Sequence, residues 1–95
     1  MNQYEVLYLI TPELDEETNK AVIEKFAGII TANGGEIVKQ DEWGKRRLAY
    51  AIDYKTEGYY VLVDFNAAPT LPAELERNFR NDERILRYMV TSKVA

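Results

Sequence analysis

The sequence predicts one α+β domain over residues 1–95, and three observations support this prediction. Four stretches alternate apolar residues with a period of two, which is typical of strands. Two other stretches place apolar residues three and four positions apart, as on one face of a helix. The length is that of a single domain, which can build one core without disulfides or metals.

The first predicted strand covers residues 4–10 and is apolar on both faces. Pro12 ends it, because proline lacks the N–H that a strand ladder needs. Asp15 then has the position of a helix N-cap, with Glu16 and Glu17 in the first turn, where the helix dipole favours anions. Helix capping therefore explains this acidic cluster better than catalysis or metal binding does.

The first predicted helix is defined by an apolar stripe and a glycine stop. Val22, Phe26, Ile29 and Ile30 lie on one side at helical spacing. The sequence Asn33-Gly34-Gly35 then ends the helix, because glycine is the usual residue just past a helix C-terminus.

The second predicted strand runs from Glu36 to Ile52 and is long and bent. Gly44 lies inside it, and a glycine within a strand indicates a bulge. Lys45, Arg46 and Arg47 follow the bend. Taken alone, this run fits either solubilising charge on an edge strand or a phosphate-binding patch.

The second half of the chain repeats the pattern of the first. Residues 53–58 form a polar connection, and residues 59–65 form a strand that is antiparallel to the previous one if the two make a hairpin. Helical spacing follows at Leu71, Leu75 and Phe79. The last predicted strand covers residues 84–92.

This order of elements predicts a split βαβ, or ferredoxin-like, arrangement (βαββαβ), in which a four-stranded antiparallel sheet carries both helices on one face. By alternation, the residues that face the helices are Tyr4, Val6, Tyr8, Ile10, Val61, Val63, Phe65, Leu86, Tyr88 and Val90. The opposite face then carries Leu7, Leu9, Tyr60, Leu62, Ile85 and Met89, with Arg87 among them.

The second sheet face is unusually apolar, since an antiparallel sheet with one solvated face normally has polar residues there. A contiguous apolar patch commonly marks an interaction surface, although scattered aliphatic residues without a function are the alternative. We expect a protein partner to contact five half-exposed side chains of this face, which are Leu7, Leu9, Tyr60, Leu62 and Met89.

Catalysis and metal chemistry have little support in the composition. The chain has no cysteine and no histidine, which removes thiolate nucleophiles, the usual near-neutral base and most zinc or copper chemistry. It has no glycine-rich phosphate loop either. We therefore expect no catalytic residue, metal, cofactor or small-molecule substrate. The N-terminus runs directly into a strand and no stretch is long enough to span a membrane, so we expect a cytoplasmic protein.

The charge is distributed unevenly along the chain. The net charge of −4 comes from nine acidic and three basic residues up to Glu42 and seven acidic and nine basic residues after it. An RNA recognition motif is nevertheless a poor match, because its third-strand signature fails at the basic and small positions of residues 57–62. As a group the later cations favour contact with the RNA backbone, although ion pairing with nearby glutamates is the alternative. The predicted RNA-binding residues are Lys45, Arg46, Arg47, Arg80, Arg84, Arg87 and Lys93.

Four blocks of the sequence resemble a known family. They are Tyr4-Glu5-Val6 with the following Leu-Ile-Thr-Pro, the run from Trp43 to Tyr50, the strand start Glu57-Gly58-Tyr59-Tyr60, and the closing stretch from Asn81-Asp82 to Val90. The chain resembles the protein six family of the bacterial small ribosomal subunit over essentially its whole length. The most specific block is Gly-x-Arg-Arg-Leu-Ala-Tyr at residues 44–50.

The resemblance implies a structural role in the small ribosomal subunit. A protein of this family is expected to pair with small-subunit ribosomal protein eighteen and to bind the central domain of 16S ribosomal RNA as that heterodimer. Joint binding also fits the acidic net charge, because the partner can supply cations. The alternative is a protein-interaction domain of the same fold that binds no RNA.

Overall fold

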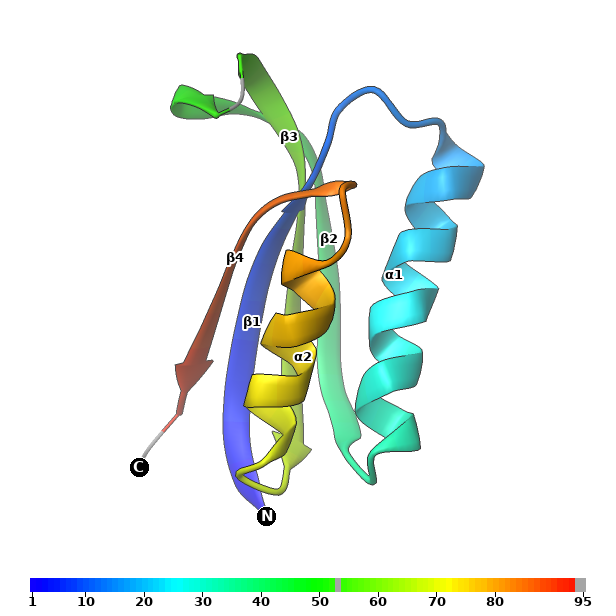
Figure 1. Ribbon diagram of the computed structural model, residues 1–95, viewed down its shortest axis with the longest axis vertical. Helices are drawn as coiled ribbons and strands as arrows, with labels where there is room; N and C mark the ends of the chain where they lie inside the picture. Colours follow the sequence, from blue (N-terminus) through cyan, green and yellow to red (C-terminus); the bar gives the residue numbers. More distant parts are fainter. Residues whose placement is uncertain (53, 94–95) are drawn as a thin grey trace.

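The computed structural model describes residues 1–52 and 54–93. Its elements, in chain order, are β1 (Asn2–Ile10), α1 (Glu16–Ala32), β2 (Glu36–Ile52), β3 (Lys55–Ala67), α2 (Leu71–Arg80) and β4 (Ile85–Ser92). The strands form one antiparallel sheet in the order β2-β3-β1-β4. Both helices lie on the same face of this sheet (Figure 1). The predicted ferredoxin-like arrangement is therefore confirmed.

The hydrophobic core lies between the sheet and the two helices. Its centre is aromatic, because the rings of Phe26 and Phe79 stack with centroids 4.2 Å apart and Tyr8 packs against both. Burial of each such side chain contributes roughly 1.5 to 3 kcal/mol to stability. The largest fully buried side chains are those of Val6, Tyr8, Ile10, Val22, Phe26, Ile30, Val61, Phe65, Leu75 and Phe79.

A bulge in β4 changes one part of the predicted face assignment. Leu9 pairs with Arg87 and Ile10 pairs with Ile85, so Leu86 is an extra residue without a partner on β1. One extra residue reverses the alternation beyond it. Ile85 consequently packs against the core, and the prediction that Ile85 lies on the open face was wrong.

The β2–β3 hairpin is longer than predicted. β3 begins at Lys55, so most of the predicted connection is strand, while Asp53 lies outside the described residues. Tyr54 adopts a φ of 65° in the turn. The end of the hairpin, here called the hairpin arm (residues 44–52 and 54–58), projects beyond the rest of the sheet on the side of β4 (Figure 1).

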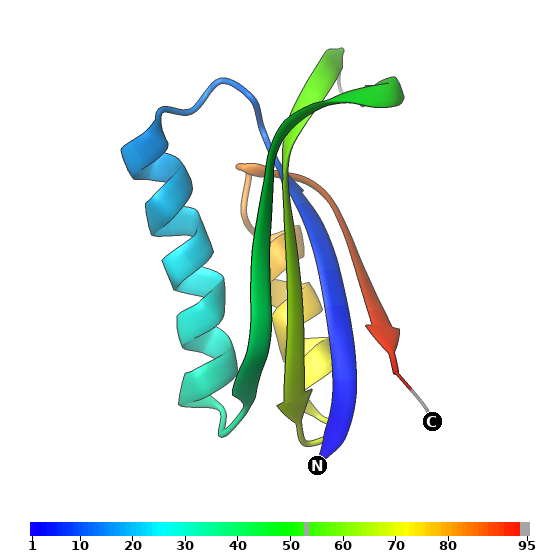
Figure 2. The same ribbon diagram turned by 180° about the vertical axis from the view of Figure 1, so that it is seen from behind.

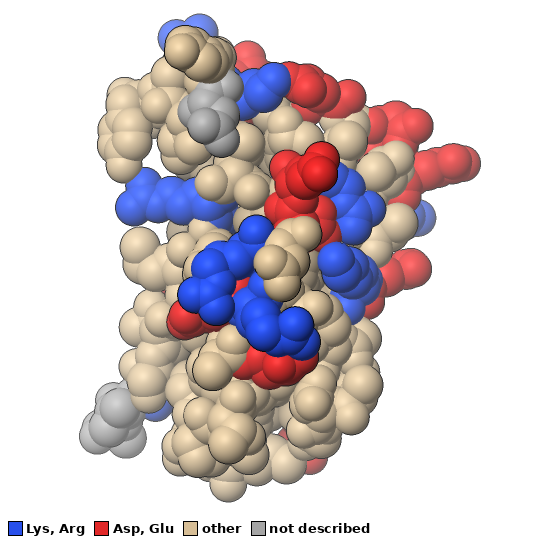
Figure 3. Space-filling model, viewed as in Figure 1, with Lys and Arg blue, Asp and Glu red and all other residues tan. Residues whose placement is uncertain are grey.

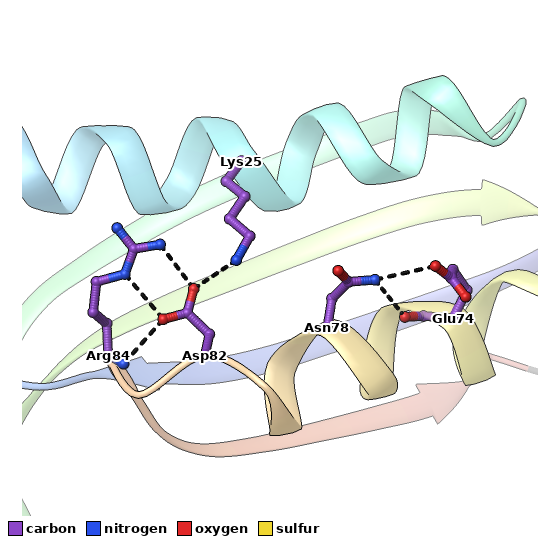
Figure 4. Close-up of polar contacts among 5 residues, drawn as sticks. All are labelled: Lys25, Glu74, Asn78, Asp82 and Arg84. Carbon is purple, nitrogen blue, oxygen red and sulfur yellow. Dashed lines mark hydrogen bonds and ion pairs between the residues drawn. The ribbon is translucent and has the colours of Figure 1, made fainter.

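An ion cluster links α1 to the loop between α2 and β4 (Figure 4). The carboxylate of Asp82, just after α2, accepts hydrogen bonds from the side chain and the backbone N–H of Arg84. It also accepts one from Lys25 of α1 at 2.9 Å. The predicted N-cap is confirmed too, since Asp15 accepts a hydrogen bond from the N–H of Thr18.

Candidate functional site

The face of the sheet that carries no helix is turned towards the viewer in Figure 2. Strand pairing brings the five predicted partner residues together on this face. Leu7 on β1 lies between Leu62 on β3 and Met89 on β4. Leu9 lies between Tyr60 and Arg87 in the same way. Cross-strand partners project from the same side of a sheet, so these side chains form one continuous surface, here called the open face.

Leu9 is more buried than we predicted. Only 5% of it is exposed, whereas Met89 is 53% exposed and Leu7, Tyr60 and Leu62 are half-buried. The hairpin arm is the reason, because a Cβ added at Gly58 would lie 3.3 Å from Cδ2 of Leu9. Leu9 is therefore part of the floor of the open face and not a half-exposed contact residue.

The hairpin arm turns part of the open face into a groove. Between the pairs Arg47–Glu57 and Ile52–Lys55, four residues of β2 stand opposite one residue of β3, so the arm curls over the sheet. The groove has a volume of about 240 Å³. It is lined by Leu7, Leu9, Leu48, Ala49, Tyr50, Ile52, Tyr60, Arg87, Tyr88 and Met89.

Five of these lining residues were not among the predicted contacts, namely Leu48, Ala49, Tyr50, Ile52 and Tyr88. Among them, Leu48 is buried, although it lies on an edge strand, and Tyr50 is exposed. The hydroxyl of Tyr50 accepts a hydrogen bond from Nη1 of Arg87 at 2.7 Å. The alternation of Leu48, Tyr50 and Ile52 was visible in the sequence, but it fitted an ordinary flat strand equally well.

The predicted bulge at Gly44 is confirmed. Glu42 pairs with Val61 and Gly44 pairs with Tyr60, so Trp43 is the extra residue. Gly44 has a φ of 81°, in the left-handed region that favours glycine. The ring of Trp43 stacks on Tyr60 with centroids 6.0 Å apart, which places an aromatic pair at the β2 edge of the open face.

The basic run at residues 45–47 does not form a one-sided patch. Arg46 pairs with Gly58 on the open face and its guanidinium lies 5.5 Å from the centre of the Trp43 ring. Lys45 pairs with Tyr59, whose ring packs against the core on the helix side. All three cations are exposed, so they present charge on both sides of the sheet edge.

The other predicted RNA-binding residues differ in how far their charges are already neutralised. Arg84 is paired with Asp82, and Lys93 lies 3.3 Å from Asp64 and 3.6 Å from Glu5. Ion pairing thus occurs for these two, but with Asp82 for Arg84 and with Asp64 and Glu5 for Lys93, and not with the neighbouring glutamates that the alternative named. Among the residues that the structure describes, Arg80 and Arg87 meet no carboxylate within ion-pair distance.

Lysine and arginine side chains and carboxylates each gather at certain places on the helix side of the molecule, although some of both kinds lie side by side (Figure 3). Lysine and arginine side chains gather over the C-terminal half of α2, and carboxylates surround the N-terminal half of α1. Over residues 1–52 and 54–93, no group of three or more metal-ligating side chains is placed to hold a metal ion. None of the described helices is long and apolar enough to cross a membrane.

A ferredoxin-like domain with an apolar open face and exposed cations at two edges has the features of a macromolecule-binding protein. Comparison with known proteins assigns it to a family. Residues 3–92 match the family model described as ribosomal protein S6, and the chain belongs to that family. It is therefore a ribosomal protein of the small subunit, associated with ribosomes in the cytoplasm, and its family consists of ribosomal proteins and not of enzymes.

Individual relatives support the assignment over nearly the full length. The chain is 51% identical over 92 residues to small ribosomal subunit protein bS6 of Clostridium novyi, covering 97% of each chain. It is 50% identical over 90 residues to the bS6 protein of Caldanaerobacter subterraneus, covering 95% of each. The crystal structure of 30S ribosomal protein S6 from Thermotoga maritima superposes with a TM-score of 0.93 at 29% identity, covering 97% of this chain and 87% of that one.

Proposed function

We propose that this protein binds the central domain of 16S ribosomal RNA jointly with small-subunit ribosomal protein eighteen, which docks on the open face. The observation that carries the proposal is the apolar character of that face, including its groove. Apolar side chains that stay accessible on a contiguous sheet surface are typical of a protein-binding site. Their burial by a partner removes apolar area from water, which favours association.

The proposed phosphate contacts come first from Arg80 and from Lys45, Arg46 and Arg47. These side chains are exposed, and among the described residues none of them is held by a carboxylate. Three other cations remain predicted phosphate contacts, but each already has a partner within the protein. Arg84 pairs with Asp82, and Arg87 donates a hydrogen bond to Tyr50. Lys93 lies close to Glu5 and Asp64.

The experiment is an electrophoretic shift of a 16S central-domain fragment at low salt, with this protein added alone, with protein eighteen alone, and with both. We expect a shifted species containing all three components, and weaker binding by either protein alone. If no mixture that contains this protein shifts the fragment more than protein eighteen does, the proposed RNA role is wrong. A protein-interaction domain without RNA binding is then the remaining interpretation.

A further inference from the structure

Arg87 is the one charged side chain among the described residues that line the groove of the open face. Its cross-strand partner on β1 is Leu9, and Met89 lies two residues further along the same face of β4. The guanidinium has five N–H donors, of which one, on Nη1, is donated to the hydroxyl of Tyr50. A full positive charge therefore lies in apolar surroundings with a neutral acceptor as its hydrogen-bond partner.

The carboxylates of the open face lie elsewhere. Glu5 and Asp64 pair across β1 and β3 towards the opposite end of the sheet, where Lys93 approaches both. Among the described residues, no carboxylate reaches Arg87 within ion-pair distance. The charge of Arg87 is consequently uncompensated within this part of the chain, whereas the cation at the other end of the face is compensated.

We propose that Arg87 and the groove together recognise a protein segment that carries an apolar side chain next to an aspartate or glutamate. The apolar side chain enters the groove against Leu9, Leu48 and Met89, and the carboxylate takes the free N–H donors of Arg87. This inference rests on the proposed function, because the segment is assigned to small-subunit ribosomal protein eighteen.

The geometry favours a carboxylate over an RNA phosphate at this position. A carboxylate accepts two parallel hydrogen bonds from the guanidinium fork, and such a pair is strong where water is excluded. A phosphate keeps its charge close to water and is commonly held by several cations, but Arg87 is alone in this groove. With a volume of about 240 Å³, the groove suits individual side chains better than a whole helix about 10 to 12 Å in diameter.

The test is a binding titration of purified protein eighteen with the full chain and three variants. We expect Arg87→Gln to weaken binding about thirtyfold or more, mainly through faster dissociation, because a carboxylate loses its partner in a desolvated setting. Arg87→Lys should restore part of the loss, since lysine keeps the charge but not the fork. Lys20→Gln removes the same charge from an exposed side chain of α1, on the helix side of the sheet, and should leave protein binding unchanged.

Melting curves keep the result independent of folding, because Arg87 is exposed and its replacement should not change the melting temperature. A loss of affinity in Arg87→Gln no larger than that in Lys20→Gln overturns the inference while leaving the proposed function intact. The inference is also overturned if Arg87→Gln binds protein eighteen normally and lowers the salt dependence of RNA binding, because Arg87 would then be a phosphate contact. If the unaltered chain does not bind protein eighteen at all, the proposed function is wrong and this inference falls with it.

Discussion

The guanidinium of Arg84 donates two hydrogen bonds to the carboxylate of Asp82, with distances of 2.9 Å from Nε to Oδ1 and 2.8 Å from Nη2 to Oδ2. The side chain of Asp82 is only 4% exposed and is also bound by Lys25 of α1. We expect Asp82→Asn to lower the free energy of unfolding by about 2 kcal/mol, because both cations keep part of their hydration and so lose less than a fully buried pair. Urea denaturation measures this loss, and an unchanged midpoint would show that the cluster adds nothing to stability.

The same carboxylate makes stability depend on pH. The hydrogen bonds from Arg84 hold the pKa of the Asp82 carboxyl well below its ordinary range. A lowered folded-state pKa contributes stability that is present above the unfolded pKa of about 4 and is lost as the pH falls below it. We therefore expect the difference in stability between the unaltered chain and Asp82→Asn to shrink between about pH 5 and pH 2. A difference that stays constant over that range would contradict the assignment.

Tyr8 gives a prediction of the opposite sign. Its side chain is fully buried, and its hydroxyl has no hydrogen-bond partner among the described residues. Removing an unsatisfied buried group relieves its desolvation cost, so Tyr8→Phe should leave the free energy of unfolding unchanged or raise it by up to about 1 kcal/mol. Tyr59→Phe is the matched control, since the Tyr59 hydroxyl donates to Glu42 at 3.0 Å and its loss should be neutral or slightly destabilising. A clear loss of stability in Tyr8→Phe would mean that the hydroxyl has a partner.

The loss of stability at alkaline pH tests the same hydroxyl. Burial raises the pKa of Tyr8 far above its ordinary value. A raised folded-state pKa contributes stability that is present below the unfolded pKa of about 10 and is lost as the pH rises above it. Tyr8→Phe should remove that part of the alkaline destabilisation. Identical alkaline profiles for the two proteins would exclude Tyr8 as its source.

Leu9 and Met89 should respond differently to the same substitution. Leu9→Asp places a carboxylate under the hairpin arm, where 5% of the residue is exposed, and should cost about 3 kcal/mol of stability. Met89→Asp changes a residue that is 53% exposed and should alter stability by less than about 0.5 kcal/mol. It should nevertheless weaken binding of protein eighteen at least tenfold, or about 1.4 kcal/mol. Normal binding by a folded Met89→Asp protein would show that the partner does not dock on β4.

The role of Arg80 can be measured through salt. If Arg80 contacts an RNA phosphate in the ternary complex, Arg80→Gln should lower the slope of log affinity against log salt by roughly 0.7 to 0.9. Lys20→Gln is the control, because it removes the same charge from an exposed side chain of α1 that lies near Glu16 and Glu17. Equal slopes for Arg80→Gln and the unaltered chain would restore a purely solubilising role for Arg80.

Local patterns were sufficient to predict the order of the elements. Each strand and helix carries its own periodicity, and Gly44 marked its bulge because a left-handed φ is selective for glycine. The bulge at Leu86 has no such mark, since a leucine fits either a regular or a bulged strand. Alternation counted through it therefore placed Ile85 on the wrong face.

The site was less predictable than the fold for a physical reason. Alternation indicates which face a side chain occupies, but it does not indicate what covers that face. Leu9 was assigned correctly to the open face, but it is buried because Gly58 of the hairpin arm lies against it. Ion pairs are equally hard to predict from periodicity. Arg84 reaches Asp82 because of the geometry of the loop after α2, and not because the two residues have a helical spacing.

The stacking of Trp43 on Tyr60 also gives the protein an intrinsic optical reporter. Trp43 is the only tryptophan in the chain, so its emission can be excited selectively without labelling. The residue is 42% exposed at the β2 edge of the open face, and its ring stacks on Tyr60, which is expected to contact the partner. Docking on that face should shift the emission to shorter wavelength and shield it from acrylamide quenching. Binding confined to α2 should leave the spectrum unchanged, so one fluorescence titration distinguishes docking on the open face from binding at α2.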